Sequence, residues 1–209
     1  MIKKIRDQEH EKKPSLRIST IAYGREKKGN RVVYLVDPKG KGSIKKNAEA
    51  LVLYRWRRRV FKGYSFSGAK LNPKIWRTLP DIFGPNIKNW SLFTEDKINE
   101  ILQKNKEEMQ KTFVRLPSAN ILFALFQICK SENITKLIER HNDPERVNNY
   151  GTPDLFLFTK KIGIRKINIA RFVEVKKPDE PLKQDQRDEI KFLQSLGLHA
   201  RVIRLDERK

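Results

Sequence analysis

The chain has 209 residues, 38% hydrophobic and 34% charged, which suits one core-containing domain with an appendage. Its 46 Lys and Arg residues against 25 Asp and Glu give a net charge of +21, which predicts attraction to polyanions such as nucleic acids. No apolar run approaches the roughly 18 residues of a membrane span, the N-terminus lacks a signal-peptide core, and a lone cysteine, Cys129, excludes an internal disulfide. We therefore expect a soluble, intracellular protein without membrane contact, in a prokaryotic or virus-infected cytoplasm or in a nucleus.

The positive charge is concentrated in the first third of the chain. Residues 1–70 carry 20 basic and 6 acidic side chains. Residues 1–30 show no apolar periodicity, so we interpret them as a basic N-terminal arm, or as containing an edge strand in LRISTIAYG. A surface charged only for solubility is the alternative to nucleic-acid binding.

Residues 31–62 are expected to form a strand followed by a helix. RVVYLVD (31–37) has the composition of a strand, and PKGKG (38–42) that of a loop. Ser43 is a candidate N-cap for a helix that runs to about Lys62 and is terminated by Gly63. The helix carries four arginines, which form either a solvated face or a phosphate-binding surface. These are Arg55, Arg57, Arg58 and Arg59.

The middle of the chain is predicted to be helical. TEDKINEILQKNKEEMQK (94–111) begins with Thr94 and two acids, which is typical of a helix N-terminus. Residues 118–141 are expected to form one or two further helices. HNDPERVNNYG (141–151) has the composition of a loop.

The last third is predicted to contain three strands and a helix. PDLFLF (153–158) and INIARFVEVK (167–176) favour a hairpin. Residues 182–196 are expected to be helical, with Gly197 just past the end, and HARVIRL (199–205) to form a strand parallel to the second strand of the hairpin. The arrangement predicts an α/β fold on a mixed sheet.

Charged residues at the ends of the hairpin strands form a candidate metal site. Residues two apart in a strand point to the same face, so Glu174 and Lys176 share one face. Asp154 begins the partner strand, and its carboxylate can converge with Glu174 on a hard divalent cation, with the carbonyl of Val175 as a third oxygen. Lys176 can then orient an attacking water and stabilise charge on a phosphate. An exposed strand with alternating charge is the alternative.

The following helix carries a glutamine on its apolar face. Gln186 shares this face with Leu182, Ile190 and Leu193 by helical spacing. A buried glutamine needs hydrogen-bond partners, which a metal-coordinated water or a nucleotide backbone would supply. A glutamine on the rim of the face is the alternative.

These motifs resemble the virus-type replication-repair nuclease (VRR-NUC) domain, a branch of the PD-(D/E)XK nucleases. Residues 151–205 contain Gly-x-Pro-Asp-Leu, Glu-Val-Lys, Leu-x-x-x-Gln, an apolar helix, Gly and a hydrophobic strand, in the order of that family. The resemblance implies a restriction-endonuclease-like fold, in which helices flank a mixed sheet, and phosphodiester cleavage dependent on Mg²⁺ or Mn²⁺. It implies metal binding by Asp154, Glu174 and the Val175 carbonyl, and catalytic roles for Lys176 and Gln186 beside the two carboxylates.

A weaker similarity extends upstream, to the segment before the nuclease motifs of Fanconi-associated nucleases. It involves RVVYLVD, AEALVLYRWRR (48–58) and KIWRTLPDIFG (75–84). It places residues 31–209 in one nuclease module, with a helical N-terminal part at 31–150 and the catalytic core at 151–209.

The upstream similarity also shows a departure from the family pattern. Ser67 stands where those nucleases have a metal-binding glutamate. A third carboxylate is therefore either missing or supplied by Glu49, which is otherwise an ordinary acid in a first helical turn.

The sequence as a whole predicts a structure-specific DNA nuclease of repair or replication that leaves 5′-phosphate and 3′-hydroxyl ends. Its DNA is expected to be branched, flapped or end-containing, and to be contacted by Lys177 and the four arginines. The alternatives are a dimeric resolvase of the Holliday-junction type and a nucleic-acid-binding protein that has lost catalysis. The sequence leaves the oligomeric state open.

Overall fold

The computed structural model describes residues 18–28, 31–35, 47–111, 116–146, 151–163 and 167–207. Its centre is a six-stranded mixed sheet with the strand order β2-β1-β6-β5-β4-β3. The strands are β1 (Ile18–Lys28), β2 (Arg31–Leu35), β3 (Tyr64–Lys70), β4 (Leu155–Lys161), β5 (Ile167–Lys176) and β6 (Ala200–Glu207). Strands β5, β6 and β1 run parallel, and the other neighbours are antiparallel.

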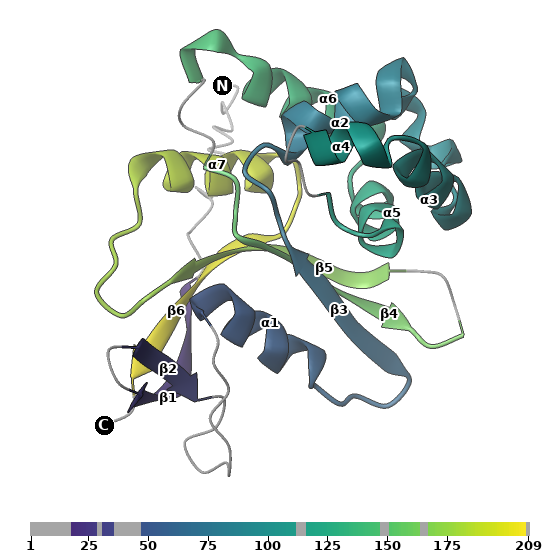
Figure 1. Ribbon diagram of the computed structural model, residues 1–209. Helices are drawn as coiled ribbons and strands as arrows, with labels where there is room; N and C mark the ends of the chain where they lie inside the picture. The colour runs from purple at the N-terminus through teal and green to yellow at the C-terminus, as the bar shows by residue number, and fades with distance from the viewer. Residues whose placement is uncertain are drawn as a thin grey trace, which may run out of the picture.

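Helices cover both faces of the sheet (Figure 1). They are α1 (Ala48–Arg57), α2 (Ile75–Phe83), α3 (Glu95–Lys104), α4 (Lys106–Lys111), α5 (Ala119–Ile128), α6 (Ser131–Asn142) and α7 (Gln184–Ser195). Two 3₁₀ segments, η1 (Gly84–Leu92) and η2 (Pro144–Arg146), follow α2 and α6. Figure 1 shows α1 on one face, and α7 with the α2–α6 group on the other. No helix in these described ranges has both the length and the apolar character needed to cross a membrane.

Two hydrophobic cores follow from the alternation of side chains along β4 and β5. Phe156 and Phe172 face the larger core, together with buried residues of α2, α5, α6 and α7. Leu155 and Val173 face the smaller core beneath α1. The helices that precede residue 151 therefore share a core with the strands that follow it.

The predicted hairpin and the parallel third strand are confirmed. β4 pairs antiparallel with β5, and β5 pairs parallel with β6 across α7. The predicted middle helices are also confirmed: residues 94–111 form α3 and α4, which meet at Asn105, and residues 118–141 form α5 and α6. Thr94 caps α3 as predicted, because its hydroxyl accepts from the Lys97 N–H at 3.2 Å.

The predicted limits of the first helix are wrong. Helix α1 begins at Ala48, since the side chain of Asn47 accepts from the Ala50 N–H at 2.9 Å, whereas Ser43 lies outside the described residues. The helix ends at Arg57, five residues before Lys62, because the chain then turns tightly into β3. Strand β3 itself was not predicted.

The interpretation of residues 1–30 as an arm is wrong for residues 18–28. They form β1, which lies between β2 and β6 and is therefore not an edge strand either. Tyr23 of β1 is fully buried in the core beneath α1, which explains the apolar residues of this segment. Residues 1–17 lie outside the described part of the chain. The strand predicted at 31–37 is confirmed over 31–35.

Cys129 packs as the small hydrophobic residue that its apolar surroundings predicted. It is fully buried at the end of α5, and burial raises the pKa of its thiol to about 12. The thiol is therefore protonated and chemically inert at neutral pH.

Candidate active site

Asp154 is fixed beside the end of β5 by two backbone contacts. Its own carbonyl accepts from the Leu71 N–H at 2.9 Å, which ties it to the end of β3. Its carboxylate Oδ2 accepts from the Val175 N–H at 2.8 Å. The register of the hairpin thus brings Asp154 next to the Glu-Val-Lys segment, as the sequence predicted.

The glycine that precedes Asp154 in the motif has a steric reason to be there. Gly151 has φ +53°, and a Cβ at this position would lie 2.6 Å from the Asp185 carbonyl and 3.0 Å from Cβ of Glu189. Only glycine lets the chain pass this closely under the first turn of α7. Gly151 therefore sets the approach of Asp154 to the site.

Glu174 is held between α7 and its own strand. Its side chain is almost fully buried on the sheet face opposite Val173. The Gln186 amide donates to Glu174 Oε1 at 2.5 Å, and the Lys176 ammonium lies 3.1 Å from the same oxygen. The predicted apolar face of α7 is confirmed, but Gln186 itself is half-buried and its partner is Glu174.

Lys176 bridges two carboxylates. Its side chain is 2% exposed, and its ammonium contacts Glu180 Oε1 at 3.0 Å as well as Glu174. Burial alone would lower the pKa of Lys176, but the hydrogen bonds that its ammonium donates to Glu180 and Glu174 raise it above the ordinary value. Lys176 is therefore a fixed cation at the site. An exposed strand with alternating charge, the alternative interpretation, does not describe residues this buried.

Sequence reasoning missed Glu180 and Arg204. Glu180 also accepts from the Lys177 N–H at 3.3 Å, which closes the loop after β5. Arg204 of β6 donates through Nη1 to the carbonyls of Lys177, Pro178 and Glu180 at 3.0, 2.6 and 3.0 Å. For Glu180, the sequence signal that could have been used is its i, i+4 spacing from Lys176. Arg204 gave none, since only the parallel pairing of β5 with β6 brings it to this loop.

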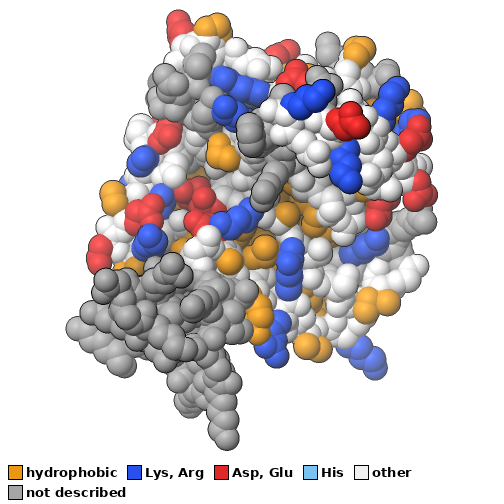
Figure 2. All heavy atoms as spheres, in the orientation of Figure 1, with side chains coloured by type: hydrophobic (Ala, Val, Ile, Leu, Met, Phe, Trp, Pro, Cys, Tyr) orange, Lys and Arg blue, Asp and Glu red, His pale blue; other side chains and the backbone are white. Residues whose placement is uncertain are grey.

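Negative charge accumulates where Asp154 and Glu174 meet. Burial, and then the charge of Asp154, raise the pKa of Glu174 to about 7. Burial also raises the pKa of Asp154, and the charge of Glu49 raises it further. The hydrogen bond from the Val175 N–H lowers this pKa but does not cancel the effect of burial. Figure 2 shows several acidic side chains, with basic ones beside them, on the surface between α7 and α1.

This pair of carboxylates fits a hard divalent cation. The donors are oxygens, which Mg²⁺ and Mn²⁺ prefer, and a cation between them would offset the burial and repulsion that raise both pKa values. Within the described ranges, no three His, Cys, Asp or Glu side chains converge closely enough to hold a metal by themselves. The groups that could hold the cation in this arrangement are therefore the two carboxylates, Asp154 and Glu174, and the backbone beside them, and Glu49 would join them only by moving from its ion pair with Lys70.

Comparison with known proteins identifies the family. A model of the VRR-NUC domain matches residues 89–206, more than half of the chain. The chain belongs to the VRR-NUC family. A search of curated protein sequences gave no match.

Two solved structures of paFAN1 share the fold of this VRR-NUC protein. One is bound to a 5′ flap DNA of 2 nucleotides with a gap, and superimposes with a TM-score of 0.57 at 13% identity. The other is bound to a 1-nucleotide 5′ flap DNA with a gap, and superimposes with a TM-score of 0.53 at 13% identity. Each match covers 94% of this chain and 38% of the paFAN1 chain. The predicted fold class, an α/β mixed sheet flanked by helices, is confirmed.

The VRR-NUC chain has no carboxylate at Ser67, and the structure places that position away from Asp154. Ser67 pairs with Phe158 in the middle of β4, whereas Lys70 pairs with Leu155 next to Asp154. Glu49, in the first turn of α1, accepts from Lys70 Nζ at 3.1 Å and acts on Asp154 through its charge. Of the two positions, Glu49 is the one that the fold brings toward Asp154.

The predicted nucleic-acid-binding arginines do not form one uniform surface. Arg57 donates to the Gly68 carbonyl at 2.5 Å, Arg58 packs over the Tyr54 ring, and Arg59 packs over the Trp56 ring. Arg57, Arg58 and Arg59 are exposed, and Arg55 is half-buried. Lys177 is exposed, on the opposite side of the strand end from Lys176.

Proposed function

We propose that this VRR-NUC protein is a metal-dependent DNA nuclease that hydrolyses phosphodiester bonds and leaves 5′-phosphate and 3′-hydroxyl ends. The observation that carries the proposal is the convergence of Asp154, Glu174 and Lys176. Two carboxylates with raised pKa values lie beside a buried ammonium at the meeting point of β4 and β5. An ion pair that only stabilised the fold would not need Asp154, because Glu174 and Glu180 already neutralise the charge of Lys176.

Asp154 and Glu174 would hold Mg²⁺ or Mn²⁺, with the Val175 carbonyl beside them and Glu49 as the candidate third carboxylate. A divalent cation supplies Lewis-acid stabilisation of the scissile phosphate and lowers the pKa of a coordinated water. Hydrogen bonds within the chain orient both carboxylates. Asp154 is fixed by the Val175 N–H, and Glu174 by Gln186.

Lys176 places a positive charge where negative charge grows during hydrolysis. The ammonium is held by two carboxylates at 3.0–3.1 Å, so it is oriented before any substrate binds. A preorganised charge stabilises the transition state without reorganisation during the reaction. We assign Lys176 the role of positioning the attacking water and stabilising the pentacovalent phosphate, with Glu174 as its anchor.

Gln186 and Arg204 are positioning residues. Gln186 uses its carbonyl to accept from the Lys183 N–H at 3.1 Å while its amide donates to Glu174, so α7 fixes the carboxylate. Arg204 fixes the loop that carries Glu180. Supports of this kind typically contribute 10- to 100-fold to metal affinity or activity.

A branched or flapped DNA is the substrate class we propose. The net charge of +21 favours a polyanion, and the paFAN1 structures that share the fold are bound to flap DNA. Because the chain corresponds to 38% of the paFAN1 length, any substrate preference set by the remainder of that protein is not carried over.

The test is a panel of end-labelled substrates incubated with Mg²⁺, with Mn²⁺, or with EDTA. The panel holds a 5′ flap, a 3′ flap, a blunt duplex, single-stranded DNA, a four-way junction and an RNA duplex. We expect metal-dependent cleavage of flapped or ended DNA, with products that a ligase joins without prior phosphorylation. Asp154→Asn should bind the same substrates and cleave none.

The same panel separates the alternatives. Paired symmetric cuts in the four-way junction would identify a resolvase, and binding without cleavage in either metal would identify a protein that has lost catalysis. Cleavage that persists in EDTA would contradict the metal-dependent mechanism.

A further inference from the structure

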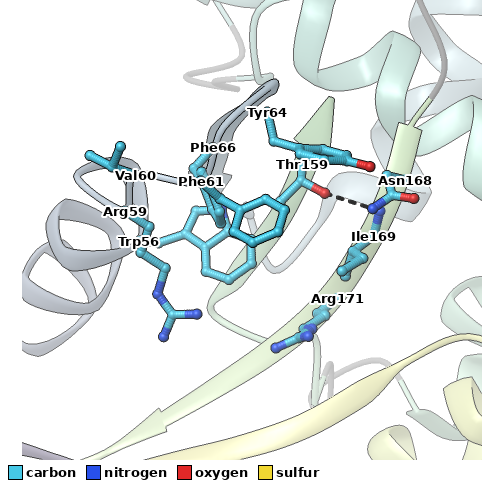
Figure 3. Close-up of a pocket in the computed structure, with 10 residues that line it drawn as sticks. All are labelled: Trp56, Arg59, Val60, Phe61, Tyr64, Phe66, Thr159, Asn168, Ile169 and Arg171. Atoms are coloured by element: carbon cyan, nitrogen blue, oxygen red, sulfur yellow. Dashed lines mark hydrogen bonds between the residues drawn. The ribbon is translucent and has the colours of Figure 1, made fainter. Parts of the chain in front are cut away.

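A second concave site lies on the α1 face of the sheet. It is a pocket of about 560 Å³, within the range of roughly 300–1,000 Å³ that is usual for small-molecule sites. Its walls include four aromatic rings and two arginines (Figure 3). These are Trp56, Phe61, Tyr64, Phe66, Arg59 and Arg171.

The aromatic walls are held in place by a hydrogen bond to the backbone and by contacts between rings. The Trp56 indole donates to the Ser67 carbonyl at 2.8 Å and packs edge-on against Phe66, with the ring centroids 5.1 Å apart. The rings of Phe61 and Tyr64 pack against each other in a tilted arrangement across a tight turn, with their centroids 5.4 Å apart. That turn requires Gly63, whose φ of +81° other residues rarely adopt.

Both arginines pack on the same indole ring. The guanidinium carbons of Arg59 and Arg171 lie 5.0 and 5.6 Å from the centroid of Trp56. Burial, and then the charge of Arg59, lower the pKa of Arg171. Two cations that repel each other through their charges favour an anion that can interact with both.

The pocket also concentrates exposed apolar surface. Among the residues that the structure describes, six large hydrophobic side chains are exposed, and Val60, Phe61 and Ile169 of these line the pocket. Phe61 is 65% exposed. Figure 2 shows Lys and Arg side chains interspersed with hydrophobic ones over α1, on the surface that leads to this site.

The pocket is separate from the candidate active site. Thr159 and Ile169 in its floor lie toward the end of the hairpin that is remote from Asp154, and the Ile169 N–H donates to the Thr159 hydroxyl (Figure 3). The five residues from Asp154 to Thr159 span about 17 Å of strand. Glu174 and Lys176 point to the opposite face, toward α7.

We propose that this pocket binds one unpaired nucleotide of a nucleic-acid strand, with the base against Phe61 and Tyr64 and a phosphate between Arg59 and Arg171. Every base has an apolar π-face that stacks on aromatic rings, and guanidinium groups pair with phosphate. Charge favours this occupant over a second copy of the chain, which carries the same net charge of +21. The inference rests on the proposed function, because a nuclease that acts on flapped or ended DNA meets unpaired nucleotides.

The experiment measures binding of a fluorescein-labelled oligothymidylate of six residues, in EDTA and in the Asp154→Asn background, by anisotropy. An abasic oligomer of the same length and charge is the comparison. We expect the thymidylate to bind more tightly, and Phe61→Ser to weaken its binding about 5- to 150-fold while leaving the abasic oligomer unchanged, since stacking contributes about 1–3 kcal/mol per base. Phe61→Tyr should retain the affinity, and Arg59→Gln should weaken both oligomers. Leu92→Ser, at an exposed apolar residue of η1, is the matched control and should have no effect.

Two results would overturn the inference. Equal affinities for the thymidylate and abasic oligomers would exclude base stacking. A Phe61→Ser variant that binds the thymidylate normally would exclude the pocket as the binding site, and if it also dissociates a dimer, the pocket would be a subunit interface. If the protein binds and cuts flapped DNA but Phe61→Ser does not change thymidylate binding, only the pocket assignment fails. If no nucleic acid binds at all, the proposed function fails with it.

Discussion

The side-chain amide of Gln186 donates a 2.5 Å hydrogen bond to Oε1 of Glu174, the oxygen that Lys176 also contacts at 3.1 Å. This contact links the first turn of α7 to the end of β5. It explains why a polar side chain interrupts the apolar face of α7, and it makes the orientation of a candidate metal ligand depend on a residue in another element.

We predict that Gln186→Ala lowers activity by weakening the hold on Glu174. The expected effect is about 10- to 100-fold in turnover or in the Mg²⁺ concentration that gives half-maximal cleavage. The measurement is cleavage of a flap substrate across a Mg²⁺ titration. Gln184→Ala is the control, because Gln184 lies on the same helix and, among the described residues, donates to the Asp188 side chain rather than to the candidate site. Equal behaviour of the two variants would contradict the positioning role of Gln186.

Lys176→Met is predicted to lower turnover about 100- to 1,000-fold while changing DNA affinity by less than about tenfold. The charge that it removes acts mainly when the phosphate becomes more negative. Because Lys176 is buried between Glu174 and Glu180, we also expect lower stability, so melting curves must accompany the single-turnover rates. Lys177→Met should change little, since Lys177 is exposed and points away. Similar losses in turnover from the two substitutions would refute the strand register that defines the site.

Arg58→Gln combined with Arg59→Gln should weaken DNA binding and flatten its salt dependence. Each phosphate contact contributes about 0.9 to the slope of log K against log salt for duplex DNA, so the double variant loses up to about 1.8. Arg57 is left unchanged because it supports the Gly68 carbonyl. The control pair is Lys130→Gln with Lys136→Gln, at exposed lysines before and within α6. A larger loss from the control pair would place the DNA path over α6.

Glu189→Gln is predicted to lower the free energy of unfolding by about 3 kcal/mol at neutral pH, because it breaks a buried charged network. Glu189 is fully buried on α7 and contacts Arg140 and His141 of α6, each at 2.8 Å. Burial alone would raise the pKa of Glu189, but the hydrogen bonds and charges of His141 and Arg140 hold it below the ordinary value. The carboxylate therefore stabilises the fold above its unfolded pKa of about 4.3, and this stabilisation is lost as the pH falls through the lower folded value.

Urea unfolding between pH 3 and pH 8 tests this expectation. The difference between wild type and Glu189→Gln should be largest above about pH 5 and shrink below about pH 4. Glu139→Gln, on the exposed side of α6, should stay within about 0.5 kcal/mol of wild type at every pH. If the difference in unfolding free energy between wild type and Glu189→Gln does not change with pH, the ionised carboxylate is not what stabilises the fold.

The part of the fold that carries the candidate site was predictable because its sequence signals are local. The alternation in residues 167–176, the turn before it and the helix spacing after it specify β5 and α7 without reference to distant segments. Asp154 and Glu174 could therefore be paired from sequence.

The remaining features depend on contacts between distant segments. Strand β1 ends in the polar run GREKK and is placed by pairing with β6 and β2. Strand β3 shows a weak apolar pattern that pairing with β4 completes. The end of α1 is decided by the turn at Gly63 rather than by helix propensity. Arg204 reaches the loop after β5 from the neighbouring strand β6, and the pocket joins α1, β3, β4 and β5. No pattern within any one segment indicates such contacts.

Cleavage of a labelled 5′ flap by wild type, Asp154→Asn and Glu174→Gln, with and without Mg²⁺ or Mn²⁺, tests the central claim most directly. The account predicts metal-dependent cleavage by the wild type. It predicts no cleavage by either variant, with flap affinity equal to wild type or tighter, because each substitution removes a negative charge near the phosphate. Full activity of Asp154→Asn in Mg²⁺, or cleavage by the wild type in EDTA, would contradict it.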